Sequence, residues 1–453
     1  MSTLAATTLA VWLVFTRSDW YQIHRILTDG PAAVAAVRGS DGQEAVAAWA
    51  EALGQLGRLD DVLSFVHNPP AAPAMSKASI EATILVKAAR GLGDAGYTAD
   101  AQKVAKDALS AAQRIPSEEI DSQVSVLAEV GQVLAWSGET KQATTTLSKA
   151  LIAARQIHNH DQQTAEVAEV AEAMAEAGHI EDAKRLGASV LAGPPAKDSY
   201  SYAESFHLSR LAAALARAGS FGDALSLAHR IEQRYSRARD ARLYGIEATS
   251  EIAQMWSQAG KADQAKRAWE EAHAEADVME DAHLRALALA QVGRTLVRAG
   301  RISEAATVLN EAFEVAHESQ TGPSAVLDWS DVATALAESG RLSDALLLAR
   351  QSGYPVDALS RVAEALAHAG KNDQAKVVWE EARAAALRSD QRSRANTLVS
   401  VARAAARLHL YREARLAAES SAPTQRLNAY AAVLTEYAKE DNPTLRQWLE
   451  TER

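Results

Sequence analysis

The chain has 453 residues, of which 48% are hydrophobic and only 5% aromatic, and its formal net charge is −11. This acidic balance lacks the overall basic charge of a general nucleic-acid binder, so no nucleic-acid partner is expected. The absence of cysteine excludes disulfides, thiolate metal sites and a cysteine nucleophile.

The first feature along the chain is an apolar stretch at residues 4–15 (LAATTLAVWLVF). It is shorter than the roughly 20 residues that cross a bilayer. No Lys or Arg precedes it and no clear small-residue cleavage site follows it, unlike in a signal peptide. We interpret it as part of a buried helical cap and expect a cytoplasmic protein without membrane contact. A membrane or export signal, or a chain that begins inside a larger parent protein, are the alternatives.

A recurring phrase then organises most of the sequence. A helix end rich in small residues is followed by Gly and, five residues later, by Ala, as in LARAGSFGDA and LVRAGRISEA. The period is near 40 residues, which indicates a repeat architecture. The anchor positions are Gly57, Gly96, Gly138, Gly178, Gly219, Gly260, Gly300, Gly340, Gly370 and His409, of which the first and last belong to degenerate copies.

Each period predicts two helices. The first carries apolar residues at helical spacing, and the anchor Gly ends it in a conformation with positive φ. A polar residue such as Ser303, Ser343 or Asp373 is expected to cap the second helix. Only 30 residues separate Gly340 from Gly370. We therefore expect a shortened helix and a bend in the array at this interval.

The units resemble tetratricopeptide (TPR) repeats. The segment WSDVATALAESGRLSDA places Trp329, Leu336, Gly340 and Ala345 on the TPR pattern, and Trp269 and Trp379 occupy the aromatic position of the second helix. The period is longer than the 34 residues of a TPR unit. The resemblance implies an all-α, right-handed α-solenoid of about ten TPR-like helix-turn-helix repeats. We expect a helical cap at 1–40, the repeat array at 41–422 and a second helical cap at 423–453.

Small residues at the turn should let the paired helices approach closely, with the Ala after each anchor in the contact. Trp269, Trp379 and Trp329 are expected in the core, as is usual for a Trp at one helical phase. Trp136 precedes Gly138 by two residues, and for this residue groove and core remain equal alternatives.

Catalytic signatures are few. The sequence contains no GxxxxGK[ST], GxGxxG, HExxH or GxSxG motif, and the cluster His158-Asn159-His160-Asp161 has no third ligand at a recognisable spacing. We expect no cofactor, no metal and no enzyme activity. An enzyme on an (α/α) toroid is the alternative, and it would need two carboxylates on opposite sides of a sugar site.

If the TPR phasing holds, residues six and two positions before each anchor line the concave face. Most are polar or charged, which fits either a solvated face or a groove with alternating acidic and basic sectors that binds a peptide. Arg294 and Arg298 would hold a carboxylate or phosphate, and Gln254 and Gln258 would pair with a peptide backbone. The predicted groove residues are Arg90, Gln132, Trp136, Glu172, Glu176, Arg217, Gln254, Gln258, Arg294 and Arg298.

The sequence therefore favours a scaffold or sensor module for protein–protein interaction, which binds a protein or peptide partner in the concave groove. The first alternative is the repeat sensor arm of a larger bacterial signalling or defence NTPase system. A toroid enzyme and a membrane-tethered scaffold are further alternatives, and homo-oligomer formation stays open. The excess of Arg over Lys and the high Ala content indicate a bacterial source.

Overall fold

A computed structural model describes residues 19–37, 39–66, 75–194, 198–235, 239–319, 327–389 and 391–439. These residues form 22 α-helices, α2 to α23, and one short 3-10 helix, with no strand among them. The predicted all-α fold of TPR-like helix pairs is confirmed. The apolar stretch 4–15 lies outside the described residues, and no helix within them is both long and apolar enough to cross a membrane.

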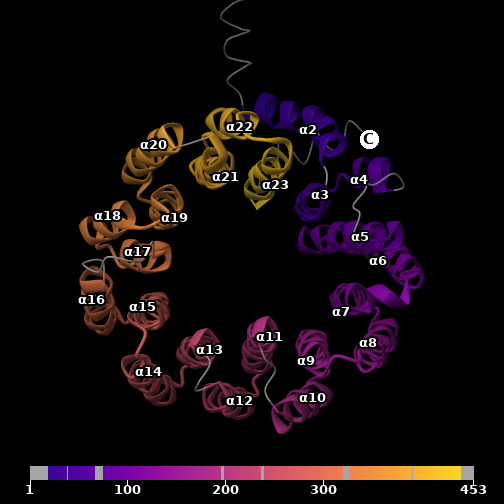
Figure 1. Cartoon of the computed structure of the whole chain (residues 1–453), viewed down its shortest axis with the longest axis horizontal. Helices are drawn as coiled ribbons and strands as arrows, with labels where there is room; N and C mark the ends of the chain where they lie inside the picture. Colours follow the sequence, from indigo (N-terminus) through magenta and orange to yellow (C-terminus); the bar gives the residue numbers. More distant parts are fainter. Residues whose placement is uncertain are drawn as a thin grey trace, which may run out of the picture. The chain divides into compact units, whose positions relative to one another are not determined.

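The chain divides into two compact units, which are Met1–Ala111 with Leu359–Arg453 (unit 1) and Ala112–Ala358 (unit 2). Unit 2 consists of six consecutive helix pairs (Figure 1). Its helices are η1 (Ser117–Glu119), α7 (Ile120–Trp136), α8 (Thr140–Ala154), α9 (His160–Glu176), α10 (Ile180–Ala192), α11 (Asp198–Arg217), α12 (Phe221–Arg234), α13 (Arg239–Gln258), α14 (Ala262–Asp277), α15 (Ala282–Arg298), α16 (Ile302–Ser319), α17 (Ser330–Glu338) and α18 (Leu342–Gln351).

The helices of unit 2 form two layers. The first helix of each pair packs against the first helix of the next pair, so α7, α9, α11, α13, α15 and α17 make a continuous inner layer. The second helices form the outer layer of a curved array (Figure 1), and they are α8, α10, α12, α14, α16 and α18. The inner helices α9, α11, α13 and α15 thus each meet their own partner and two inner neighbours, which leaves one face of each open.

Unit 1 contains helices from both ends of the chain. They are α2 (Asp19–Ala36), α3 (Ser40–Gln55), α4 (Leu59–Val66), α5 (Lys77–Asp94) and α6 (Thr98–Ala112), together with most of α19 (Pro355–His368), α20 (Asn372–Arg388), α21 (Gln391–Arg407), α22 (Tyr411–Glu419) and α23 (Pro423–Lys439).

The two ends of the chain meet in unit 1. Helix α23 packs between α21 and α3, so the inner row of this unit runs α21, α23, α3 and α5. Helix α2 packs on α23 and α22, and Arg415 Nε donates to Gln22 Oε1 at 2.7 Å. The C-terminal α23 and the N-terminal α2 therefore form a helix pair whose two members come from opposite ends. The segments predicted as two caps contact one another through these helices, and the domain boundaries stay a prediction.

The anchor positions adopt the predicted turn. All nine anchor glycines have positive φ, and His409, in the degenerate copy, is the only described non-Gly residue with positive φ, at 58°. At one turn, Lys261 N donates to Trp256 O at 2.9 Å and Gly260 N donates to Ser257 O at 3.0 Å. This is a Schellman pattern, which satisfies the last carbonyls of the first helix.

The predicted side-chain caps of the second helices are wrong. Helices α16, α18 and α20 begin at Ile302, Leu342 and Asn372, so Ser303, Ser343 and Asp373 lie inside the first turn. The residue directly after the anchor precedes the helix, and its carbonyl accepts the first helical bond, as when Ala345 N donates to Arg341 O at 3.0 Å. That residue is the N-cap, but its backbone is not extended: Ser220, which precedes α12, has ψ of 52° and makes no side-chain cap hydrogen bond.

The predicted core is confirmed. Trp269, Trp379 and Trp329 are buried, and the first two donate their indole N–H groups to Thr295 Oγ1 and Val401 O, each at 3.0 Å. Trp136 is instead 47% exposed. The Ala five residues after an anchor is fully buried at every position that has one, namely Ala101, Ala143, Ala183, Ala224, Ala265, Ala305, Ala345, Ala375 and Ala414.

The short interval contains a short helix, as predicted. Helix α18 has 10 residues, whereas α16 has 18, and it ends at Gln351. Ser352 N then donates to Leu348 O at 2.8 Å, and α19 begins at Pro355. The expected bend at this interval stays a prediction.

We expect Ala305→Leu to lower the free energy of unfolding by about 1–3 kcal/mol, because three added carbons would overpack a fully buried contact. Thermal unfolding followed by circular dichroism measures the change. Thr307→Leu, an exposed position of the same helix, is the matched control and should change stability by less than about 0.5 kcal/mol. Equal melting of both variants would contradict the packing.

A second substitution tests the joint between the chain ends. A Cβ atom at Gly30 in α2 would lie 2.2 Å from Trp49 Cζ2 in α3, and Trp49 contacts Tyr430 in α23 at 6.4 Å between ring centroids. Gly30→Ala should therefore lower the melting temperature, although Ala favours helix by about 1 kcal/mol over Gly. Gly222→Ala, where nothing lies within 4 Å of the added Cβ, should leave or raise it. A stabilising effect at both sites would contradict the close contact of Gly30 with Trp49.

Candidate functional site

Charged residues on the inner layer of unit 2 are paired between neighbouring helices. Glu172 and Glu176 of α9 face α11, where Arg210 Nε donates to Glu172 and Arg217 Nη2 donates to Glu176 at 3.2 Å. His207 Nδ1 lies 2.8 Å from the second oxygen of Glu172. Glu172 is only 5% exposed, so these partners compensate a carboxylate that has lost most of its water.

Ion pairs of the same type join the inner helices α15 and α17. Arg294 and Arg298 of α15 both donate to Glu338 of α17, at 3.2 Å and 3.5 Å for their Nη2 atoms. The carboxylate or phosphate predicted for these two arginines would have to displace Glu338, and this role stays a prediction. The arginine pairs Arg210/Arg217 of α11 and Arg294/Arg298 of α15 therefore all have acidic partners on the helix farther from α13.

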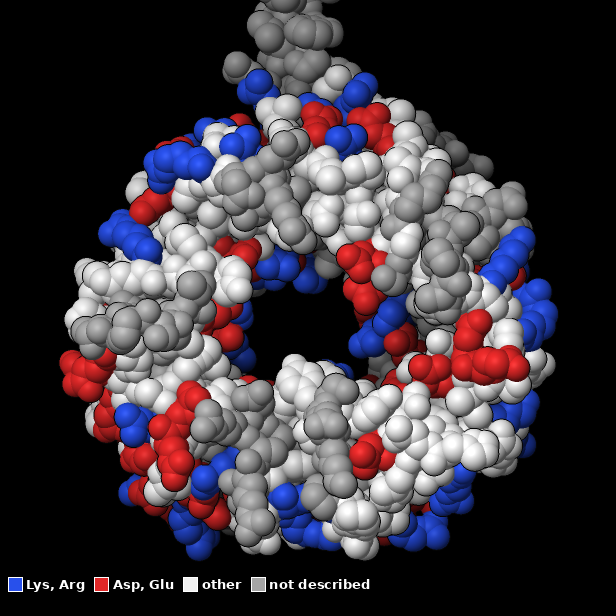
Figure 2. Space-filling model, in the orientation of Figure 1, with Lys and Arg blue, Asp and Glu red and all other residues white. Residues whose placement is uncertain are grey.

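Helix α13 lies between these two basic helices, and it carries Glu247 and Glu251 one turn apart. Neither carboxylate makes a hydrogen bond or ion pair within the described part of the chain. Acidic and basic side chains lie close together along the inner layer (Figure 2). Because the neighbouring arginines already have partners, the charge left without a close partner at this position is acidic.

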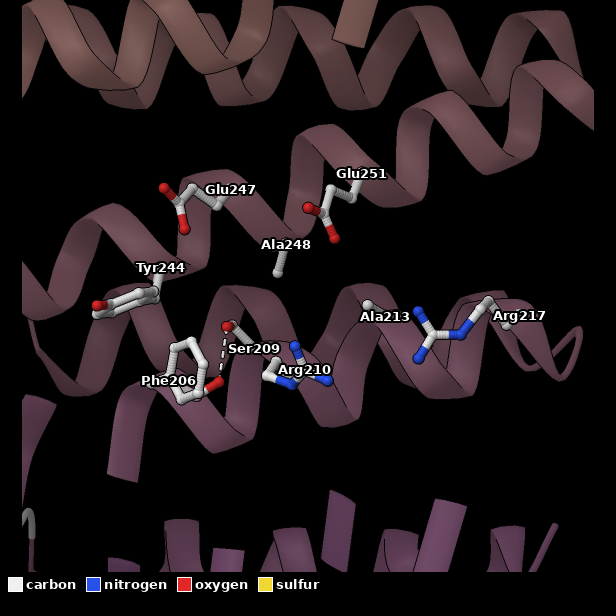
Figure 3. A pocket seen from close by; sticks show the side chains of 9 residues that line it. All are labelled: Phe206, Ser209, Arg210, Ala213, Arg217, Tyr244, Glu247, Ala248 and Glu251. Atoms are coloured by element: carbon white, nitrogen blue, oxygen red, sulfur yellow. Dashed lines mark hydrogen bonds between the residues drawn. The ribbon is translucent and has the colours of Figure 1, made fainter. Parts of the chain in front are cut away.

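Glu247 and Glu251 line a cleft of about 290 Å³ between α11 and α13. Figure 3 shows the carboxylate of Glu251 directed toward α11 and that of Glu247 on the side of Tyr244. Phe206 and Tyr244 lie at one end of the cleft and Arg217 at the other. The two aromatic rings meet edge to face, 5.9 Å apart. The cleft thus offers an aromatic end, two carboxylates in the middle and an arginine at the far end. Its lining residues are Phe206, Ser209, Arg210, Ala213, Arg217, Tyr244, Glu247, Ala248 and Glu251.

The surroundings shift the pKa values of these carboxyl groups. Burial, then the nearby charges of Glu251 and Asp331, raise the pKa of Glu247 to about 7, against a smaller opposing effect of Arg294. Burial also raises the pKa of Glu251, although four arginines of α11 and α15 oppose it. At Glu172 burial acts in the same direction, but hydrogen bonds from His207 and Arg210 outweigh it and lower the pKa. Direct partners therefore distinguish Glu172 of α9 from Glu247 and Glu251 of α13.

The structure divides the ten predicted groove residues. Arg90 lies on α5 in unit 1 and the other nine lie in unit 2. Of these nine, Glu172, Glu176, Arg217, Arg294 and Arg298 belong to the ion pairs, and Arg217 also lines the cleft. Gln254 and Gln258 lie on α13 outside the cleft lining. Gln132 is buried and Trp136 is exposed on α7.

The cleft residues that the sequence analysis missed have a recognisable spacing. Arg210, Glu247 and Glu251 precede Arg217, Gln254 and Gln258 by seven residues each. Seven residues are two helical turns, so both sets share a face. The prediction used only the positions six and two residues before each anchor, near the C-terminal end of the first helix. Because α11 and α13 have 20 residues each, the same face continues toward their N-terminal halves, where Arg210, Glu247 and Glu251 lie.

Two other interpretations of the sequence concern an enzyme on a helical toroid and a metal cluster at residues 158–161. The toroid enzyme would need carboxylates on opposite sides of a site, whereas Glu247 and Glu251 lie on one helix. In the cluster at 158–161, Asn159 caps α9, where its side chain accepts a hydrogen bond from Gln162 N at 3.0 Å. The capping role accounts for this residue of the cluster without a ligand.

A second, more apolar cleft of about 400 Å³ lies in unit 1 between α3 and α5. Its floor includes Ala47, Ile80 and Ile84. The side-chain amide of Gln43 lines it without a hydrogen-bond partner, but both amide atoms are shielded from the surface. Glu44, Glu51 and Lys87 also line this cleft, so it offers charges of both signs around an apolar floor. The cleft of unit 2, with two adjacent carboxylates, is the better-defined site.

No protein-family model matches the sequence, and no curated protein matches it. Among solved structures, Ton1535 from Thermococcus onnurineus NA1 is similar over 76% of this chain and 95% of its own, with 16% identity and a TM-score of 0.35. TPR-like repeats of a putative kinesin light chain from Podosopora anserina cover 45% of this chain and 98% of their own, with 18% identity and a TM-score of 0.28. Human IFIT1, solved as a dimer with PPP-AAAA, covers 93% and 89%, with 14% identity and a TM-score of 0.28. The likeness concerns the helical-repeat fold and assigns no partner.

We expect Glu247→Gln to stabilise the protein at pH 8 but not at pH 4. Since burial raises the pKa of Glu247 to about 7, the unfolded chain loses this proton first, and stability falls as the pH rises from about 4.5 to 7. Removing the ionisable group should restore on the order of 1–2 kcal/mol above pH 7. Melting temperatures measured from pH 4 to 8 test this, and Glu176→Gln, which removes a paired carboxylate, should lower stability at pH 8. A loss of stability at pH 8 in the Glu247 variant would contradict the assignment.

Proposed function

We propose that the inner layer of unit 2 binds a protein or peptide partner and that a basic side chain of this partner lies between Glu247 and Glu251. The observation that carries the proposal is the pair of carboxylates on α13 without a hydrogen bond or ion pair among the described residues. An incoming Lys or Arg would supply the missing charge. The partially dehydrated cleft strengthens such a pair relative to one on an open surface.

The rest of the cleft supports a peptide rather than a free cation. Phe206 and Tyr244 form an aromatic surface next to the carboxylates, and aromatic side chains of this kind favour apolar or cationic groups of a partner. Arg217 at the far end forms an ion pair with Glu176 but remains exposed. It can therefore also bind a carbonyl or carboxylate group of the partner peptide. These three chemistries in succession match a segment of polypeptide.

Selection from a phage-displayed library of random 12-residue peptides tests the proposal directly. The full chain should enrich peptides that contain Lys or Arg near an aromatic residue. The double variant Glu247→Gln with Glu251→Gln should lose the enrichment of basic residues, because the two charges that select them are gone. Individual enriched peptides should bind it at least about tenfold more weakly in fluorescence anisotropy, which corresponds to about 1.4 kcal/mol.

Asp263→Asn with Glu270→Gln is the matched control for that selection, since it removes two exposed acidic charges from the outer helix α14. This control should enrich the same peptides as the wild-type chain. Selection of no peptides, of acidic peptides, or of the same basic peptides by the double variant of α13 would overturn the proposal.

Binding of a basic peptide should also depend on pH. The cation favours ionised Glu247, whose pKa is about 7 in the free protein, so binding below that pH requires loss of a proton. We expect affinity to rise from pH 5.5 to 7, by at most about tenfold per pH unit, and to level off above pH 7.5. Titrations of one selected peptide across this range measure the profile. In Glu247→Gln the profile should be flatter, and an unchanged slope would contradict the role of this residue.

A further inference from the structure

The outer layer of unit 2 holds a second cluster of chemically active side chains, separate from the cleft. His273 and Asp277 lie one turn apart on α14, and Glu311 faces them from α16. His273 Nε2 lies 2.5 Å from Glu311 Oε2 and 3.8 Å from Asp277 Oδ2. One ligand atom from each residue lies within 4.8 Å of the others, and among the described residues no other group of three His or acidic side chains does so.

We propose that His273, Asp277 and Glu311 bind a divalent transition-metal ion, with Zn²⁺ as the best match. Metal–ligand bonds of about 2.0–2.2 Å place tetrahedral ligands about 3.3 Å apart, and the separations of 2.5 Å and 3.8 Å lie on either side of this value. All three ligand atoms lie within 4.8 Å of one another, close to the spacing that such a site requires. One imidazole with two carboxylates is a donor set that zinc accepts, with a fourth position left for water.

The charge of the cluster supports a dication. Asp277 and Glu311 make no ion pair with Lys or Arg within the described part of the chain, and their one shared partner is His273. Two carboxylates then face one imidazole, which compensates at most one negative charge. A Zn²⁺ ion would neutralise both. The imidazole disfavours Mg²⁺ and Ca²⁺, which prefer oxygen ligands.

The neighbouring repeat offers an internal comparison. His229 of α12 lies 2.9 Å from Glu271 of α14, so the same type of histidine–carboxylate contact joins the preceding pair of outer helices. It lacks a third ligand within reach. The contact between His229 and Glu271 therefore differs from the proposed metal site by one residue. At the proposed site Asp277, one turn after His273, supplies the third ligand. A metal at the second contact would join α14 and α16, the outer helices of consecutive repeats.

The test uses the untagged full chain, freed of metal by a chelator, and titrates it with Zn²⁺ in a calorimeter. We expect one equivalent to bind and the melting temperature to rise, because an ion that binds only the folded chain stabilises it. Asp277→Asn and Glu311→Gln should each weaken binding by at least about tenfold. Both sites are partly exposed, so these variants should keep the helical circular dichroism of the parent chain.

His229→Gln is the matched control and should bind Zn²⁺ as the parent chain does. Co²⁺ gives a second measurement, since its visible absorption reports nitrogen and oxygen ligation in the parent chain and should be lost in His273→Gln. Absence of binding to the parent chain would overturn the proposal. Equal binding by the parent, Asp277→Asn and Glu311→Gln would also overturn it, because the ion would then lie elsewhere.

Discussion

The structure depends on one backbone constraint, the left-handed conformation at the end of each first helix. With positive φ at the anchor, two backbone hydrogen bonds close the helix end and the next helix starts within two residues. Such a short connection brings paired helices into direct contact, so the Ala five residues later must be small. Repetition of this turn produces the two layers, and with them an inner row of helices whose open faces lie next to one another.

The inner row of helices brings charged residues of successive repeats close enough to form ion pairs. Residues about 40 positions apart become neighbours, so acids on α9 and α17 meet bases on α11 and α15. On an isolated helix these charged side chains would be solvated, whereas here they form ion pairs with the neighbouring helix. Helix α13 stands between α11 and α15, whose paired arginines already have acidic partners, and its Glu247 and Glu251 make no hydrogen bond or ion pair among the described residues. In unit 1 one arginine has acidic partners on both neighbouring inner helices, since Arg407 of α21 pairs with Glu364 of α19 and with Glu436 of α23.

The ends of the chain follow the same packing rule. A solenoid normally needs terminal units with a polar outer face, because its last helices would otherwise expose apolar surface. Here Tyr430 and Leu427 of α23 are buried, and α2 and α3 from the other end of the chain pack on α23. The stability of either terminal segment therefore depends on the other, and Gly30 makes room for the Trp49 ring at their junction.

The sequence by itself determined the helix pairs, the turns and the buried Ala and Trp positions, because these depend on local backbone preference and on a regular period. It also indicated an alternating acidic and basic inner face, but it selected Gln254 and Gln258 where the structure places Glu247 and Glu251 in the cleft. Only the tertiary structure decided which charges are paired, since pairing joins residues 29–44 positions apart through the rotation between repeats. The junction of α2 with α22 and α23 was equally hidden, because no local pattern records a contact between residues almost 400 positions apart.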